Sequence, residues 1–381
     1  KEGLISEERI NTSLFRLLKA RFELGEMDDD ALVPWSKISI DTVDCQMHKQ
    51  MALDITRKSM VLLHNNGVLP LGKTGARIAV MGPNANDSVM QWGNYEGTPS
   101  HTVTVLEGIR EEAGDDVRIL YSQGCDLYKD KVENLAWDQD RISEAVITAE
   151  NSDVVILCVG LDETLEGEEG DTGNSDASGD KVDLHLPKVQ EELIEKVTAV
   201  GKPTIVVLMA GSAIDLNYAQ DNCNGILLAW YPGARGGRAI ADLLFGKESP
   251  SGKLPITFYK DLEGMPEFTD YSMKNRTYRY MEKEALYPFG YGLTYSDTCV
   301  TEAEVVGEVS AESDIVLKAT VKNNGTVDTD EVVQVYIKDL DSLLAVRNYS
   351  LCGFKRVSLK AGEEKSVEFT ISNKAMNIVD E

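Results

Sequence analysis

The sequence predicts an α/β fold: a three-layer α/β/α sandwich with a mostly parallel sheet, followed by an all-β sandwich. Two observations lead to this prediction. Between about residues 60 and 245, short apolar runs alternate with segments of helical period, which is the pattern of parallel β/α domains. From about residue 302 the period changes to two, and polar turns separate the runs, as in antiparallel sandwiches.

The first predicted element is a helix over residues 6–25, with Ser6 as its N-cap and Gly25 at its end. One face of this helix carries an apolar stripe of helical period, formed by Ile10, Leu14, Leu17, Leu18 and Phe22. The acidic linker that follows offers no apolar partner for the stripe. We therefore expect another domain to precede residue 1.

The α/β elements follow in order. A helical pattern over residues 45–58 leads into a short strand at 60–63, after which strands and helices alternate. The strands are predicted over residues 77–81, 117–121, 153–159, 204–209 and 226–230, and the helices over 106–113, 141–150, 188–200 and 237–245. The strand runs are apolar without alternation, which is typical of parallel strands that helices cover on both faces.

These patterns predict four segments: a helix and linker over 1–39, an α/β domain over 40–261, an irregular connection over 262–300 and a β-sandwich over 301–381. A seven-stranded sandwich needs roughly 100 residues. The last segment is shorter, so we expect the sandwich to be truncated.

Composition limits the possible partners. The 381 residues include 64 acidic and 38 basic side chains, for a formal net charge of −26. Such a charge repels phosphate and anionic lipid, so we expect no nucleic acid and no membrane partner. No apolar run approaches the roughly 20 residues that cross a bilayer. Uncharged substrates fit this composition better, and a homo-oligomer remains open.

Cysteine and histidine spacing predicts neither a metal site nor a disulfide scaffold. The six cysteines lie far apart with no C-x-x-C pair, and the four histidines are scattered. Phosphate-binding motifs such as G-x-G-x-x-G are absent, so no cofactor is expected. The unpaired cysteines favour the cytoplasm, although the sequence assigns no compartment.

The loop after the strand at 153–159 is the first candidate site. It holds five acidic side chains within nine residues, namely Glu163, Glu166, Glu168, Glu169 and Asp171. Crowded carboxylates raise the pKa of at least one member, and a carboxyl that stays protonated near neutral pH can act as a general acid. A solvated acidic loop explains the same spacing.

A second candidate site follows the strand at 77–81. Trp92, Tyr95 and Glu96 combine an aromatic platform with a polar handle, which suits a sugar ring. The same aromatic side chains would also suit a contact between domains, so both interpretations stay open.

Several long motifs resemble glycoside hydrolase family 3. They are KSMVLLHNNGVLPL, LEGEEGD followed by GDKVDLHLPKVQ, LLAWYPGARGGRAIADLLFGKESPSGKLPITFY, NRTYRY, ALYPFGYGLTYS and DEVVQVYIKD with LCGFKRVSLKAGE. The resemblance covers nearly the whole chain. It implies a TIM-like barrel first, then an α/β sandwich, then a fibronectin type III-like domain. Residues 6–25 resemble the last helix of that barrel.

The resemblance also implies a function: a retaining exo-glycosidase with an Asp nucleophile on the barrel and a Glu acid/base on the α/β loop. The family's acid/base lies three residues before an Asp. Matching that Asp to Asp171 makes Glu168 the acid/base, with Glu166 as the alternative. Thr172 stands where the family often has Arg, so the loop departs from the family pattern at this position. The nucleophile motif is absent from the chain, so the barrel would come from upstream sequence or a separate chain.

Within the family, details such as GNYEGTPSHTVTVLEGI and GLDETLEGEEGD resemble the β-xylosidase branch. The expected function is therefore hydrolysis of terminal β-linked sugars, with β-xylosides first. A β-glucosidase of the same family is one alternative. A non-catalytic carbohydrate-binding or assembly subunit is the other.

Overall fold

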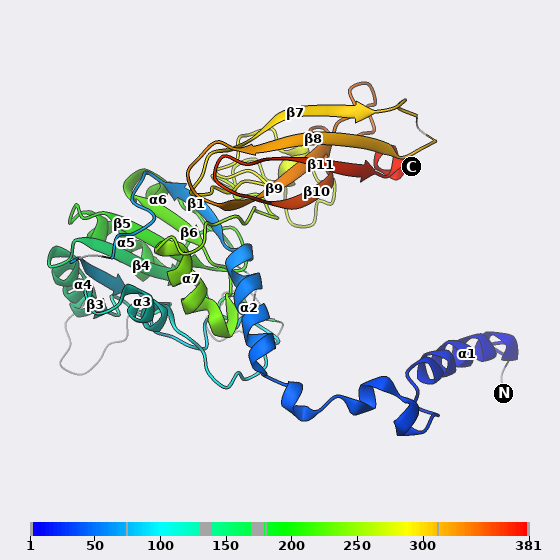
Figure 1. Cartoon of the computed structure of the whole chain (residues 1–381), viewed down its shortest axis with the longest axis horizontal. Coiled ribbons are helices and arrows are strands. Elements are labelled where there is room, and N and C mark those ends of the chain that lie inside the picture. The colour runs from blue at the N-terminus through cyan, green and yellow to red at the C-terminus, as the bar shows by residue number, and fades with distance from the viewer. Residues whose placement is uncertain are drawn as a thin grey trace. The chain divides into compact units, whose positions relative to one another are not determined.

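The computed structural model describes residues 3–73, 75–129, 139–168, 179, 181–310 and 312–378 (Figure 1). The chain divides into two compact units, Lys1–Gln50 and Met51–Glu381. Helix α2 (Gln46–Ser59) crosses the division between them.

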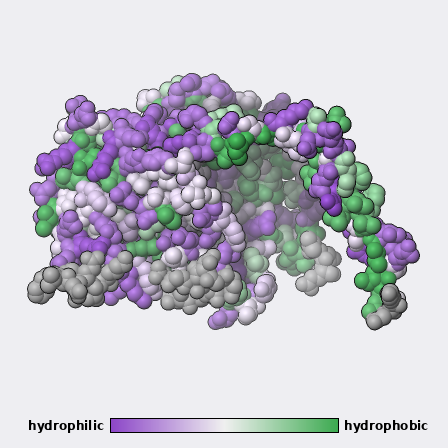
Figure 2. All heavy atoms as spheres, turned by 90° about the horizontal axis from the view of Figure 1, so that it is seen from below, coloured by the Kyte–Doolittle hydropathy of each residue, from purple (hydrophilic) through white to green (hydrophobic). Residues whose placement is uncertain are grey.

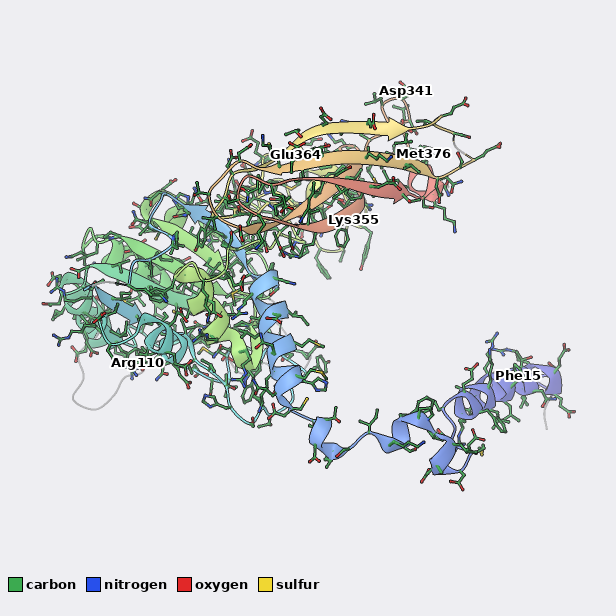
Figure 3. The ribbon with its side chains drawn as sticks, in the orientation of Figure 1. Phe15, Arg110, Asp341, Lys355, Glu364 and Met376 are labelled. Carbon is green, nitrogen blue, oxygen red and sulfur yellow. The ribbon has the colours of Figure 1, made fainter. Side chains whose placement is uncertain are left out.

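The N-terminal unit contains helix α1 (Glu7–Glu23) and three short 3-10 helices, Asp30–Leu32, Pro34–Lys37 and Ile40–Thr42. The Ser6 hydroxyl accepts a hydrogen bond from the Arg9 amide at 3.2 Å, which confirms the predicted N-cap. None of the α1 side chains is buried. Phe15, for example, projects from α1 into solvent (Figure 3), and apolar atoms of this segment lie on the surface (Figure 2).

The second unit begins with a six-stranded sheet in the order β1-β6-β5-β4-β2-β3. Strands β2 to β6 pair in parallel, and β1 joins the edge antiparallel to β6. The predicted mostly parallel sheet is therefore confirmed. The bounds are β1 (Val61–Asn65), β2 (Arg77–Met81), β3 (Arg118–Ser122), β4 (Val154–Gly160), β5 (Thr204–Met209) and β6 (Gly225–Leu228).

Helices cover both faces of this sheet, so the three-layer prediction is also confirmed. Alternate side chains of β4 enter opposite apolar cores: Val155 and Leu157 lie in one, and Ile156 and Cys158 in the other. Both faces are buried, which explains the continuous apolar run. The helices are α3 (Val105–Ala113), α4 (Asp140–Glu150), α5 (Lys188–Thr198), α6 (Asn217–Asn222) and α7 (Gly236–Leu244). Among the described residues, no helix combines the length and apolar character needed to cross a bilayer.

An irregular connection leads from the α/β domain to the sandwich and contains only the short helix α8 (Thr277–Tyr280) among its described helices and strands. The Tyr278 ring stacks on Phe289 with centroids 4.2 Å apart. Arg276 donates to the backbone carbonyls of Pro266 and Glu267 at 3.1 and 2.8 Å. These side-chain contacts hold the connection in its conformation, a task that regular secondary structure performs elsewhere.

The C-terminal part is an antiparallel sandwich with sheets β10-β9 and β11-β8-β7, as predicted. The strands are β7 (Thr298–Val306), β8 (Ile315–Asn323), β9 (Thr329–Ile337), β10 (Ser350–Leu359) and β11 (Glu364–Ile371). Val321, Val357 and Phe369 belong to its core. On β10, Lys355 (labelled in Figure 3) places its Nζ 5.6 Å from the centroid of the Phe369 ring.

Candidate active site

Four loops meet at the carboxyl edge of the parallel sheet. Strands β6, β5, β4 and β2 are neighbours and run parallel, so their following loops share one edge. Ligands of open α/β sheets bind at such edges. The acidic loop follows β4, and its residue Glu166 is bonded to the other three loops, through its carboxylate to those after β5 and β6 and through its carbonyl to the one after β2.

Three donors hold the Glu166 carboxylate. The Gly211 amide donates to Oε2 at 2.8 Å, and the Tyr231 hydroxyl donates to the same oxygen at 2.6 Å. The Ser212 hydroxyl donates to Oε1. Gly211 and Ser212 follow β5, whereas Tyr231 follows β6. The carboxylate therefore joins the loops after β4, β5 and β6. Hydrogen bonds to an ionised acceptor are stronger than those between neutral groups.

The backbone of Glu166 is fixed as well. Its amide donates to the Asp162 carbonyl at 2.9 Å, and its carbonyl accepts from Asn94 Nδ2 at 2.7 Å. Burial lowers the pKa of the Lys181 ammonium, and the nearby negative charge of Glu166 opposes this fall. The Lys181 ammonium donates to the Ala213 carbonyl at 2.7 Å. A partly buried cation therefore lies near the partly buried carboxylate.

Glu168 lies two residues beyond this anchor and is exposed. The Gly167 amide between the two glutamates donates to the Gly179 carbonyl at 3.0 Å. Glu169, Asp171 and Thr172, on which the sequence register depends, lie outside the described residues. The assignment of Glu168 as acid/base therefore stays a prediction.

In the acidic loop, Glu163 is a carboxyl group whose pKa is raised. Burial is the largest cause, and the negative charges of Asp162, Glu96 and Asp87 add to it. The sequence predicted a raised pKa in this loop from charge crowding alone, whereas desolvation contributes more. Glu163 Oε2 is buried and has no hydrogen-bond partner among the described residues. Within that part of the chain, no group of three or more His, Cys, Asp or Glu side chains is arranged to hold a metal ion.

The second predicted group lies on the loop after β2. Trp92 is half-buried, and its Nε1 donates to the Thr102 hydroxyl at 3.0 Å. Tyr95 is 86% exposed and has a positive φ of 59°. Glu96 is exposed, and its charge acts on Glu163. The structure thus brings this loop beside the acidic loop, while a role in sugar binding stays a prediction.

Sequence reasoning missed Gly211, Ser212, Tyr231 and Asn94. Each lies in a loop that follows a parallel strand, which is the one signal that could have found them. Tyr231 is part of the quoted motif LLAWYPGARGG, where it carried no assigned role.

The fold and this edge define a class of α/β proteins: a parallel sheet with a carboxylate-rich site at its carboxyl end, joined to a β-sandwich. Comparison with known families narrows the class. Residues 60–295, more than half of the chain, match the Glycosyl hydrolase family 3 C-terminal domain. Residues 331–381 match the Fibronectin type III-like domain. The chain therefore belongs to glycosyl hydrolase family 3, as the sequence motifs indicated.

Relatives with different names resemble this chain. A Xylan 1,4-beta-xylosidase of Xylanibacter ruminicola is 31% identical over 100% of the chain and 60% of its own length. A periplasmic beta-glucosidase of Salmonella typhimurium is 31% identical over 99% of the chain and 52% of its own length. The structure of a β-glucosidase from Erythrobacter marinus gives a TM-score of 0.84 at 32% identity, covering 100% of this chain and 52% of that one. The chain thus spans about half to three-fifths of these relatives.

Proposed function

We propose that this chain supplies the general acid/base of a retaining exo-β-glycosidase, and that Glu168 is that residue. Its partner in the reaction is a carboxylate nucleophile on a barrel domain, encoded upstream or on a separate chain. The substrate is a terminal β-linked sugar.

One observation carries the choice between the two glutamates. The Glu166 carboxylate already accepts three hydrogen bonds, whereas the neighbouring Glu168 is exposed at the sheet edge. A general acid must give its proton to the substrate and take one back from water. Only an accessible carboxyl group can do both, which supports Glu168.

In the proposed first step, the Glu168 carboxyl gives its proton to the glycosidic oxygen as the bond from C1 to that oxygen breaks. The nucleophile's carboxylate bonds to C1 in the same step. In the second step, the Glu168 carboxylate takes a proton from water, whose oxygen bonds to C1 as the glycosyl ester breaks. This double displacement requires the two carboxyl groups to lie about 5–5.5 Å apart.

We propose β-xylosides as the preferred substrates, because the quoted motifs resemble the β-xylosidase branch. Relatives named as β-glucosidases keep that alternative open. The ratio of kcat/KM for p-nitrophenyl β-xyloside and β-glucoside, measured in an assembly that contains the barrel, tests the preference. A ratio below one would favour the β-glucosidase.

Replacing Glu168→Gln in that assembly tests the catalytic assignment. We expect kcat/KM for xylobiose to fall by about 10²–10⁴-fold, and that for a 2,4-dinitrophenyl xyloside to fall far less, because a good leaving group needs no acid. Azide should raise kcat by replacing water in the second step. The matched control is Glu364→Gln, at the start of β11 in the sandwich (Figure 3).

Equal losses on both substrates without azide rescue would remove Glu168 from this role. The non-catalytic subunit would then gain support if the isolated chain bound xylo-oligosaccharides and the assembly with its barrel hydrolysed none.

A further inference from the structure

The Glu166 carboxylate joins loops that are distant in the sequence. Its three donors come from the turns after β5 and β6, while Glu166 itself follows β4. None of these groups is free to act on a substrate while it is engaged in this way. Together, Glu166 and its three donors form a support for the loop that carries Glu168.

Tyr231 is suited to act as a permanent donor in this support. Burial raises its pKa far above the ordinary tyrosine value, and the Glu166 charge raises it further. The hydroxyl therefore keeps its proton throughout the pH range in which an enzyme works. A protonated phenol can donate to a carboxylate, whereas a phenolate would repel it.

Two glycines leave room for the Tyr231 ring. A Cβ at Gly211 would lie 3.1 Å from Tyr231 Cε2 and 3.3 Å from Glu166 Oε2. A Cβ at Gly93 would lie 3.2 Å from Tyr231 Cδ2. Gly93 also has a positive φ of 73°, which glycine adopts without strain. Close packing against both loops thus fixes the ring that carries the donor.

The distance from this support to Glu168 is short. Two residues of extended chain span at most about 7 Å, so the Glu168 Cα lies within that distance of the Glu166 Cα. The Gly167 amide between them is itself bonded to Gly179 at 3.0 Å. A shift of the Glu166 side chain would therefore move the backbone that positions Glu168.

We propose that Glu166 and Tyr231 are positioning residues that hold the acid/base glutamate in register with the substrate. The proposal rests on the function proposed above and adds a mechanism to it. A misplacement of about 1 Å can cost as much as 10²-fold in rate, so loss of the support should weaken proton transfer specifically. Bond making at C1, which depends on the barrel, should be affected much less.

Tyr231→Phe in the assembly with the barrel provides the test, because it removes the hydroxyl and keeps the packed ring. We expect kcat/KM for xylobiose to fall by about 10- to 100-fold and that for the 2,4-dinitrophenyl xyloside to change only a few-fold. Ser212→Ala removes the donor to the other carboxylate oxygen and should give a weaker effect of the same kind. The control is Tyr218→Phe on α6, whose hydroxyl lies 3.1 Å from Thr198 Oγ1.

A purely structural role would give another result. If Tyr231→Phe lowered kcat/KM for both substrates equally, or lowered only the unfolding temperature, the positioning role would be overturned. Hydrogen exchange of this chain gives a readout without activity: exchange at the Gly211 amide should accelerate in Tyr231→Phe and stay unchanged in Tyr218→Phe. Unchanged exchange in both variants would also overturn the proposal.

The Glu168→Gln variant separates this proposal from the one on which it rests. If Glu168→Gln shows the leaving-group dependence and azide rescue while Tyr231→Phe does not distinguish the substrates, the catalytic assignment stands and the positioning role falls. If Glu168→Gln shows neither effect, the catalytic assignment fails and the positioning role falls with it.

Discussion

The guanidinium of Arg57 forms an ion pair with the fully buried carboxylate of Asp242. The Arg57 Nε lies 2.9 Å from Asp242 Oδ2, and the pair joins α2 to α7. Arg238 and Lys247 approach the other carboxylate oxygen at 3.0 and 3.5 Å. A buried carboxylate without partners would cost several kcal/mol. The network therefore holds the start of the second unit to its sheet-covering helix.

Replacing Arg57→Leu should lower the free energy of unfolding by about 2 kcal/mol. This is less than the roughly 3–5 kcal/mol for a buried pair that loses its only partner, because Arg238 and Lys247 remain. Urea unfolding followed by circular dichroism measures the change. The control is Arg77→Leu, which breaks the half-exposed pair with Asp153 and should lower stability much less, because solvent screens exposed ion pairs. Equal losses in the two variants would show that burial does not strengthen the Arg57 pair.

Glu163 should make stability depend on pH. Burial and three neighbouring carboxylates raise its pKa in the folded chain. The folded state therefore binds a proton at a higher pH than the unfolded state does. The folded chain should therefore gain stability as pH falls through the raised pKa, and lose it as pH rises. Glu163→Gln removes this dependence, so it should stabilise the chain near neutral pH.

The urea midpoints of wild type and Glu163→Gln, measured between about pH 7.5 and pH 4.5, check this expectation. The difference between the two midpoints should narrow as pH falls, because a protonated Glu163 is uncharged, as the Gln side chain is. Glu364→Gln on the sandwich should show no such trend. A gap that stays constant with pH would mean that the charge of Glu163 is not what opposes folding.

Most of the fold could be predicted from the sequence, because parallel strands that are buried on both faces appear as continuous apolar runs. The strand predicted over 153–159 is observed at Val154–Gly160, and its side chains alternate between two cores. Helix α6 was missed, since its six residues Asn217–Asn222 are mostly polar and too few to show a period. Strand β7 (Thr298–Val306) was also missed, because its largely exposed side chains leave no alternation of buried and exposed positions.

The candidate site was only partly predictable. The order of elements indicates which loops follow parallel strands, but not that β6, β5, β4 and β2 are neighbours in that order. The Glu166–Tyr231 hydrogen bond joins residues 65 positions apart, and it follows from that strand order. Spacing within one loop could not reveal this hydrogen bond, so the sequence kept Glu166 as the alternative to Glu168.

Helices α3 and α7 approach so closely that only glycine fits at their contact. A Cβ at Gly108 would lie 2.1 Å from the Gly237 carbonyl oxygen, and a Cβ at Gly237 would lie 1.9 Å from the Thr104 carbonyl oxygen. Both neighbours are backbone atoms, which cannot rotate away as a side chain would. We expect Gly108→Ala to lower the free energy of unfolding by about 3 kcal/mol, despite the roughly 1 kcal/mol that alanine gains in a helix.

Gly72→Ala is the matched control, because a Cβ there meets no atom within 4 Å. Its urea midpoint should stay close to that of the wild type, while the midpoint of Gly108→Ala falls. The clash forces the helices apart, so the apolar core beneath them, which includes Ile109 and Ile240, should also loosen. Faster hydrogen exchange in α3 and α7, but not in the sandwich, would locate the damage. If Gly108→Ala matched or exceeded the wild-type midpoint, the helix propensity of alanine would outweigh the contact.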